Sequence, residues 1–151
     1  MIGRFFRSIY HWMALSGLMM KDDEPLEKRD PNRVWGPPVN GLMLSAKAKG
    51  RRLSVVIKNA GTAEIREKIP EWVFFYQLQI SGSPPLTTFG KHALDRSRIS
   101  RPADLVLTPA KAIEAEIPVD ALYQLGPGPQ RVTASCEIAG VRLVSNEVVL
   151  E

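Results

Sequence analysis

The chain has 151 residues, of which 44% are hydrophobic and 24% are charged, and its formal net charge is +4. This length fits one domain with an appendage, and the composition allows a full hydrophobic core without disulfides or metals. The single cysteine, Cys136, excludes an internal disulfide. One cysteine and two separated histidines, His11 and His92, also argue against a zinc site, which needs three or four clustered ligands.

Residues 1–20 differ in pattern from the rest of the chain and are predicted to form an amphipathic helix. Apolar residues share one side of a helical projection and arginines lie opposite. Such a helix suits a membrane interface, and the same apolar side suits a groove on a partner protein. We therefore predict a membrane anchor or docking segment. The residues predicted to make these contacts are Ile2, Arg4, Phe5, Phe6, Arg7, Ile9, Trp12 and Met13.

Two alternatives remain open for residues 1–20. A cleaved secretory signal has a basic start, which Arg4 and Arg7 provide, but no Ala-x-Ala cleavage site follows. A membrane span needs about twenty predominantly apolar residues, and the uncharged stretch 8–20 is shorter than that. If the segment inserted, its arginines would favour a cytoplasmic N-terminus. The predicted location is therefore membrane-associated with the following domain on the extracytoplasmic side, and a cytoplasmic location is the alternative.

Residues 21–40, KDDEPLEKRDPNRVWGPPVN, are predicted to be a proline-rich linker. Because this segment has mixed charges and four prolines, it is not expected to form a helix or a strand. Trp35 is its one large apolar residue. We expect Trp35 to cover the edge or end of the domain that follows, with a partner-binding anchor as the alternative.

From residue 41 to the C-terminus, apolar and polar residues alternate in short segments separated by glycine and proline. Successive side chains of a strand point to opposite faces, so this period predicts half-buried antiparallel strands. Residues 41–151 are therefore predicted to form an all-β sandwich of seven or eight strands. In one strand, Trp72, Phe74, Tyr76, Leu78 and Ile80 are expected to share a face, and in another Cys136 is expected to be buried. The predicted strands are 42–49, 52–59, 63–69, 72–80, 104–108, 111–117, 130–138 and 141–150.

The segments WGPPVNGLMLSAKA, LSVVIKNAG, LTPAKAIEAEIPVDALYQLGPGPQRVTAS and VSNEVVLE resemble the bacterial immunoglobulin-like domains. The resemblance covers about residues 35–151. It implies an immunoglobulin-like antiparallel sandwich that acts as an adhesive, accessory or inhibitory module. The chain is also similar to small proteinase-inhibitor sandwiches with a Y-x-L…G-x-Y-x-V ending, although Gln130 stands at the usual aromatic position.

Residues 81–103 are predicted to form one long loop, and loops of this length in compact domains are often functional. The loop mixes apolar anchors with basic residues, which suits a surface that contacts another protein. Alternatively, Phe89 and Leu94 fold back to cover an open edge of the sandwich. The residues predicted to make loop contacts are Phe89, Lys91, Leu94, Arg96, Arg98 and Arg101.

The sequence carries no phosphate loop, metalloprotease motif or nucleophile elbow, so an enzyme is not expected and no cofactor is predicted. Basic clustering with stacking aromatics is also missing from the sequence, which makes nucleic acid an unlikely partner. The leading prediction is a non-catalytic binding or structural module, an accessory subunit docked on a larger, membrane-bound protein assembly. One alternative is a proteinase inhibitor that presents loop 81–103 or the turn at Gly126–Pro129. Another is a free, exported adhesive or binding domain.

Overall fold

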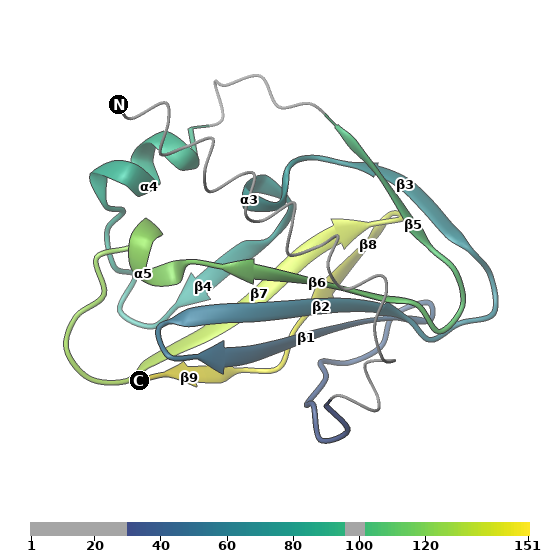
Figure 1. Ribbon diagram of the computed structural model, residues 1–151, viewed down its shortest axis with the longest axis horizontal. Coiled ribbons are helices and arrows are strands. Elements are labelled where there is room, and N and C mark those ends of the chain that lie inside the picture. The colour runs from purple at the N-terminus through teal and green to yellow at the C-terminus, as the bar shows by residue number, and fades with distance from the viewer. Residues whose placement is uncertain (1–29, 96–101) are drawn as a thin grey trace.

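The structure is a computed structural model that describes residues 30–95 and 102–151, and these residues form three antiparallel sheets and three short helices (Figure 1). Sheet A has the strand order β1-β2-β6, and sheet B pairs β3 with β5. In sheet C, β4 lies on one side of β7, and β8 and β9 lie on the other. The strands are β1 (Leu42–Lys49), β2 (Arg52–Asn59), β3 (Ile65–Ile69), β4 (Gln77–Ile80), β5 (Ala103–Leu107), β6 (Ala112–Ile117), β7 (Gln130–Ile138), β8 (Val141–Val144) and β9 (Val148–Leu150), and the helices are α3 (Trp72–Phe75), α4 (Thr88–Ala93) and α5 (Val119–Leu122).

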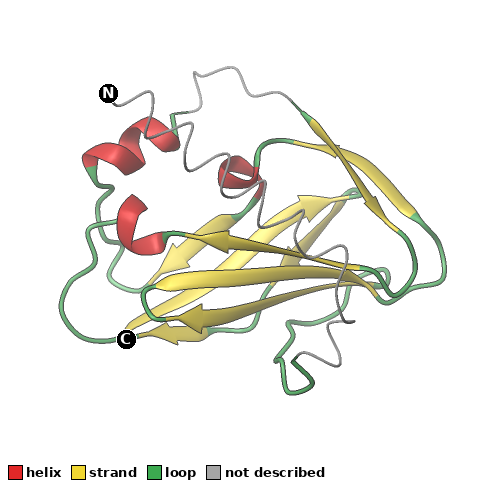
Figure 2. Cartoon of the chain, in the orientation of Figure 1, coloured by secondary structure: helices red, strands yellow, loops and turns green. Residues whose placement is uncertain are grey.

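Sheets A and C lie as two layers, with sheet B at one end and helices α4 and α5 at the other (Figure 2). The apolar residues of β1, β2 and β7 face the space between these layers and are buried in one core. The antiparallel pairing and the shared core confirm the predicted all-β class. The bounds of β1, β2 and β7 are those that the alternation predicts.

Cys136 is buried in β7, as its place in the apolar stripe predicts. Burial raises the pKa of its thiol to about 12, because the thiolate would lose its hydration in the core. Cys136 is therefore a small core residue in its thiol form.

The prediction of one strand over residues 72–80 is wrong. Trp72–Phe75 form the short helix α3, and only Gln77–Ile80 form a strand. The helical turn begins where the amides of Phe74 and Phe75 both donate to the carbonyl of Glu71. The neighbours Phe75 and Tyr76 are both buried, with ring centroids 4.8 Å apart. A flat strand points neighbours to opposite faces, so the turn brings both rings into one core.

The predicted strand 141–150 is two strands separated by a bulge. Ser135 pairs with Val144 and Val132 pairs with Val148, which leaves one extra residue between β8 and β9. The hydroxyl of Ser145 accepts a hydrogen bond from the amide of Ala134 at 2.9 Å. This side chain takes the place of a backbone carbonyl and holds the bulge against β7.

Loop 81–103 contains a helix in its first half. Thr87 caps α4 by accepting a hydrogen bond from the amide of Gly90 at 2.8 Å. Thr87 also donates from its hydroxyl to the carbonyl of Ala121, which ties α4 to α5. A Cβ atom added to Gly90 would lie 2.0 Å from the carbonyl oxygen of Leu122, so only glycine permits this approach.

The predicted amphipathic helix at residues 1–20 lies outside the described residues, and so does residue range 21–29 of the predicted linker. Among the helices that the structure does describe, none has the length and apolar character that a membrane span requires.

Candidate functional site

Residues 30–39, which we call the strap, lie along sheet A and are part of the folded domain. The amide of Gly36 donates to the carbonyl of Leu44 at 2.8 Å, and Val39 and Leu42 exchange two hydrogen bonds of 2.9 Å. A Cβ atom on Gly36 would lie 1.9 Å from the carbonyl oxygen of Val144. The strap therefore passes closely between β1 and β8, and the second half of the predicted linker is packed on the sandwich.

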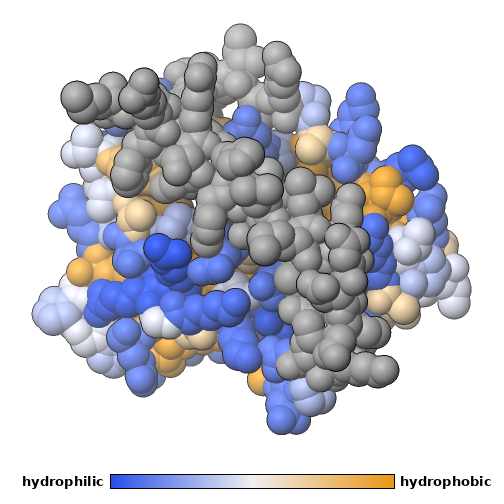
Figure 3. Space-filling model, in the orientation of Figure 1, coloured by the Kyte–Doolittle hydropathy of each residue, from blue (hydrophilic) through white to orange (hydrophobic). Residues whose placement is uncertain are grey.

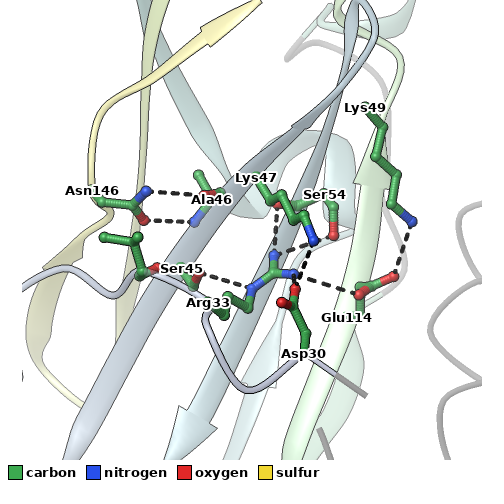
Figure 4. Close-up of polar contacts among 10 residues, drawn as sticks. Asp30, Arg33, Ser45, Ala46, Lys47, Lys49, Ser54, Glu114 and Asn146 are labelled. Atoms are coloured by element: carbon green, nitrogen blue, oxygen red, sulfur yellow. Dashed lines mark hydrogen bonds and ion pairs between the residues drawn. The ribbon is translucent and has the colours of Figure 1, made fainter. Parts of the chain in front are cut away.

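Arg33 fastens the strap to the outer face of sheet A (Figure 4). Its Nε donates to the hydroxyl of Ser45 at 2.8 Å, and Nη2 donates to the carbonyl and hydroxyl of Ser54 at 3.0 and 3.2 Å. Only 3% of the Arg33 side chain is exposed. Ser45 and Ser54 lie on the solvent side of β1 and β2 by alternation, yet both are buried because the strap covers them.

Acidic residues surround the buried guanidinium of Arg33. Asp30 lies 3.5 Å from Nη1, and Glu114 lies 3.9 Å from the same atom. Asp30 also accepts a hydrogen bond from Nζ of Lys47 at 3.0 Å, and Lys49 lies 3.8 Å from Glu114. The hydrogen bond from Lys47, followed by the charges of Lys47 and Arg33, lowers the pKa of the Asp30 carboxyl below its usual value.

Trp35 is half-buried on the same outer face of sheet A. This position agrees with the prediction that Trp35 covers part of the domain. Nζ of Lys58, on the outer side of β2, is 5.9 Å from the centroid of the Trp35 ring. Its neighbour Val34 points to solvent and is 61% exposed. Val34 therefore faces outward between two strap residues, Arg33 and Trp35, that contact the sheet.

The other end of the molecule holds the residues of the predicted loop contact. Phe89 and Leu94 are half-buried against the hydrophobic core, whereas Lys91 is exposed on α4. Packing of Phe89 and Leu94 agrees with the alternative in which they cover the sandwich. Arg96, Arg98 and Arg101 lie outside the described residues, and so do the eight predicted docking residues of segment 1–20.

Arg51 organises the Gly126–Pro129 turn at this same end. Its Nη2 donates to the carbonyl of Gly126 at 3.0 Å and to the carbonyl of Gly128 at 2.9 Å. The backbone carbonyl of Arg51 accepts from the amide of Asp120 at 3.3 Å. Arg51 of the β1–β2 turn therefore holds the backbone of the Gly126–Pro129 turn by two hydrogen bonds. Pro127 and Pro129 of that turn are exposed to solvent.

Three polar residues stabilise the domain through buried contacts that the sequence did not predict: Arg33, Asn59 and Asn146. Asn59 is almost fully buried and donates to the carbonyls of Ala63 and Leu107 at 2.8 and 2.9 Å. A charged residue in a linker or a polar residue at a strand end is normally exposed, so residue type alone did not indicate burial. For Asn59 the alternation of β2 is a signal, because it places Asn59 on the same buried face as Val55 and Ile57.

Within residues 30–95 and 102–151, no three side chains of His, Cys, Asp or Glu are grouped closely enough to hold a metal ion. The chain matched no protein-family model, and it matched no curated protein at a significant level. The ion pairs and hydrogen bonds of the strap fix residues 30–39 on sheet A.

Proposed function

We propose that this protein is an immunoglobulin-like, non-catalytic binding module that serves as an accessory subunit of a larger, membrane-bound assembly. Residues 1–20 would dock it on a membrane surface or on a subunit of that assembly, with the sandwich on the extracytoplasmic side. The observation that carries the proposal is the strap. A flexible tether would not need a buried arginine, so the fastening at Arg33 supports a segment whose position relative to the sandwich matters.

The strand orders support the immunoglobulin-like part of this proposal. The orders β1-β2-β6 and β4-β7-β8 correspond to the A-B-E and C-F-G orders of an immunoglobulin-like sandwich. Such folds serve many functions, so the role itself is argued from the strap and the amphipathic segment.

The test compares two substituted forms of the full chain with the native form. Phe5→Ser, Phe6→Ser and Ile9→Ser together disrupt the apolar side of segment 1–20, whereas Ser8→Ala and His11→Ala change only its polar side. We expect the first form to leave the membrane fraction and lose its co-purifying subunits, and the second to behave like the native chain. Retention of membrane and partners by the first form would refute the proposal.

A proteinase inhibitor is the second candidate, and the support of the Gly126–Pro129 turn by Arg51 favours it. A turn held in one conformation loses less entropy when a target binds it. This candidate predicts stoichiometric inhibition of a serine, cysteine or metalloprotease, with weaker inhibition by Arg51→Ala. If none of the three classes is inhibited, the candidate is wrong.

A further inference from the structure

Three ion pairs lie on the solvent-facing side of sheet A near the β1–β2 turn, and in each the basic side chain is more exposed than its acidic partner. The side chains of Lys47, Lys49 and Arg52, which we call the basic row, are 52%, 49% and 51% exposed. Their acidic neighbours are more covered: Asp30, Glu114 and Glu116 are 21%, 15% and 20% exposed. The ammonium and guanidinium groups therefore extend further into solvent than the carboxylates. A space-filling view shows strongly hydrophilic side chains over this end of the sheet (Figure 3).

The strap runs toward this basic row and begins beside it. It runs antiparallel to β1, because Val39 pairs with Leu42 and Gly36 with Leu44, while Asp30 contacts Lys47. The chain that precedes Asp30 is therefore attached on the Lys47 side of the strap. Residues 21–29 span at most about 30 Å when fully extended. A segment 1–20 bound to a membrane would therefore tether the basic row close to that membrane.

We propose that the basic row docks sheet A onto an anionic lipid surface, with the headgroup phosphates as its ligands. This inference rests on the proposed function, because it assumes that segment 1–20 binds a membrane. One weak apolar anchor gives marginal binding, and a basic patch supplies the second attraction needed for stable attachment. The outer face of sheet A then faces the lipid, and the outer face of sheet C points away from it.

The experiment measures sedimentation of the full chain with two kinds of vesicle. One is phosphatidylcholine alone, and in the other one lipid in three is phosphatidylserine. Lys47→Gln, Lys49→Gln and Arg52→Gln are combined in one variant. Since each basic residue near an anionic surface contributes roughly fivefold in affinity, we expect this variant to bind the anionic vesicles at least about tenfold more weakly. Its binding to neutral vesicles should not change.

A matched control removes the same charge from another part of the surface. Arg66→Gln, Lys68→Gln and Lys91→Gln change three exposed basic residues of β3 and α4. This control should bind both vesicles like the native chain. Because Lys47 contacts Asp30 of the strap and Lys49 contacts Glu114 of β6, thermal unfolding of both variants checks that the fold is kept. In addition, raising the salt concentration should weaken binding of the native chain to anionic vesicles only.

Three results would overturn the proposal. Equal losses in the two variants would assign the effect to net charge instead of to the basic row. Equal, salt-independent binding of the native chain to both vesicles would reject the basic row but leave the membrane anchor of the proposed function intact. If the native chain bound neither vesicle and the basic-row variant lost a co-purified protein, an acidic protein surface would replace lipid as the ligand.

Discussion

Asn146 pairs with Ala46 through both of its amide atoms. The amide nitrogen of Asn146 donates to the carbonyl of Ala46 at 3.0 Å, and the amide of Ala46 donates to the side-chain oxygen of Asn146 at 2.9 Å (Figure 4). β1 is one of the two edge strands of sheet A, and an unpaired edge is a template for association with other chains. The Asn146 side chain therefore acts as one further strand residue at this edge.

We expect Asn146→Ala to destabilise the protein by about 1–3 kcal/mol, because two backbone groups of Ala46 lose their partner. Asn146→Asp is the matched variant, since it keeps the acceptor and removes the donor. It should be destabilised as well, because a carboxylate oxygen then faces the carbonyl of Ala46. Urea unfolding of the three proteins measures both effects. A free energy of unfolding unchanged in both variants would show that the pairing contributes nothing.

Arg33→Ala should lower the free energy of unfolding by about 2–4 kcal/mol, since it removes several hydrogen bonds and leaves buried partners unsatisfied. Arg66→Ala is the control. Arg66 contacts Glu64 at 3.4 Å at a largely exposed position, so its loss should cost about 0–0.5 kcal/mol. Limited proteolysis provides a second readout, because release of the strap exposes the chain near residue 33. If both variants lose equal stability, the burial of Arg33 is not what stabilises the strap.

The pH dependence of the strap follows from the lowered pKa of Asp30. A carboxyl whose folded pKa lies below its unfolded value stabilises the fold above the unfolded pKa and loses that effect as the pH falls. Stability should therefore decrease as the pH falls from about 4 through the folded pKa. Asp30→Asn removes this carboxyl, so its unfolding free energy should fall less steeply over that pH range. Equal slopes in the native and substituted chains would contradict the assignment.

Gly90→Ala should separate α4 from α5, because its Cβ would lie 2.0 Å from the carbonyl oxygen of Leu122. The expected loss is about 1–3 kcal/mol from overpacking. Gly126→Ala is the control, since the nearest atom to its added Cβ lies at 3.8 Å. Thermal unfolding should distinguish the two substitutions clearly, and similar melting temperatures would mean that α4 adapts without cost.

Cys136 should resist thiol reagents in the folded protein at pH 8, since burial removes access and raises the thiol pKa to about 12. Urea should restore full reactivity. A raised pKa also means that this group's contribution to stability is complete below the unfolded value and is lost as the pH rises toward 12. Cys136→Ala should remove that alkaline dependence. Rapid labelling of the native protein would disprove burial of the thiol.

The sequence predicted those elements whose side chains obey a local period. In β1, Leu42 and Leu44 are buried while Lys47 and Lys49 are exposed, and this pattern placed both ends of the strand correctly. The prediction failed at residues 72–75, where the apolar residues are consecutive and do not select one face. Tertiary packing of Phe75 and Tyr76 decided the local structure there, and a single period cannot represent that competition.

The candidate site was less predictable than the fold, because its contacts join residues distant in sequence. Trp35 was expected to pack on the domain, and it does, but Arg33 was assigned to a proline-rich linker without regular structure. Its burial depends on two serines of β1 and β2 that the strap itself shields. Short polar residues on the outer side of a strand give no sign that another segment will cover them.

The pairing of Ala46 with Asn146 also has a consequence for how the chain folds. Its two members are separated by 100 positions, since Ala46 lies in β1 and Asn146 lies between β8 and β9. Contacts of such long range slow folding, since the loop between them must be closed first. Until they form, the edge of β1 is open to β1 of another molecule. Refolding yield should therefore fall as the protein concentration rises, and should fall more steeply when Asn146 is replaced by alanine.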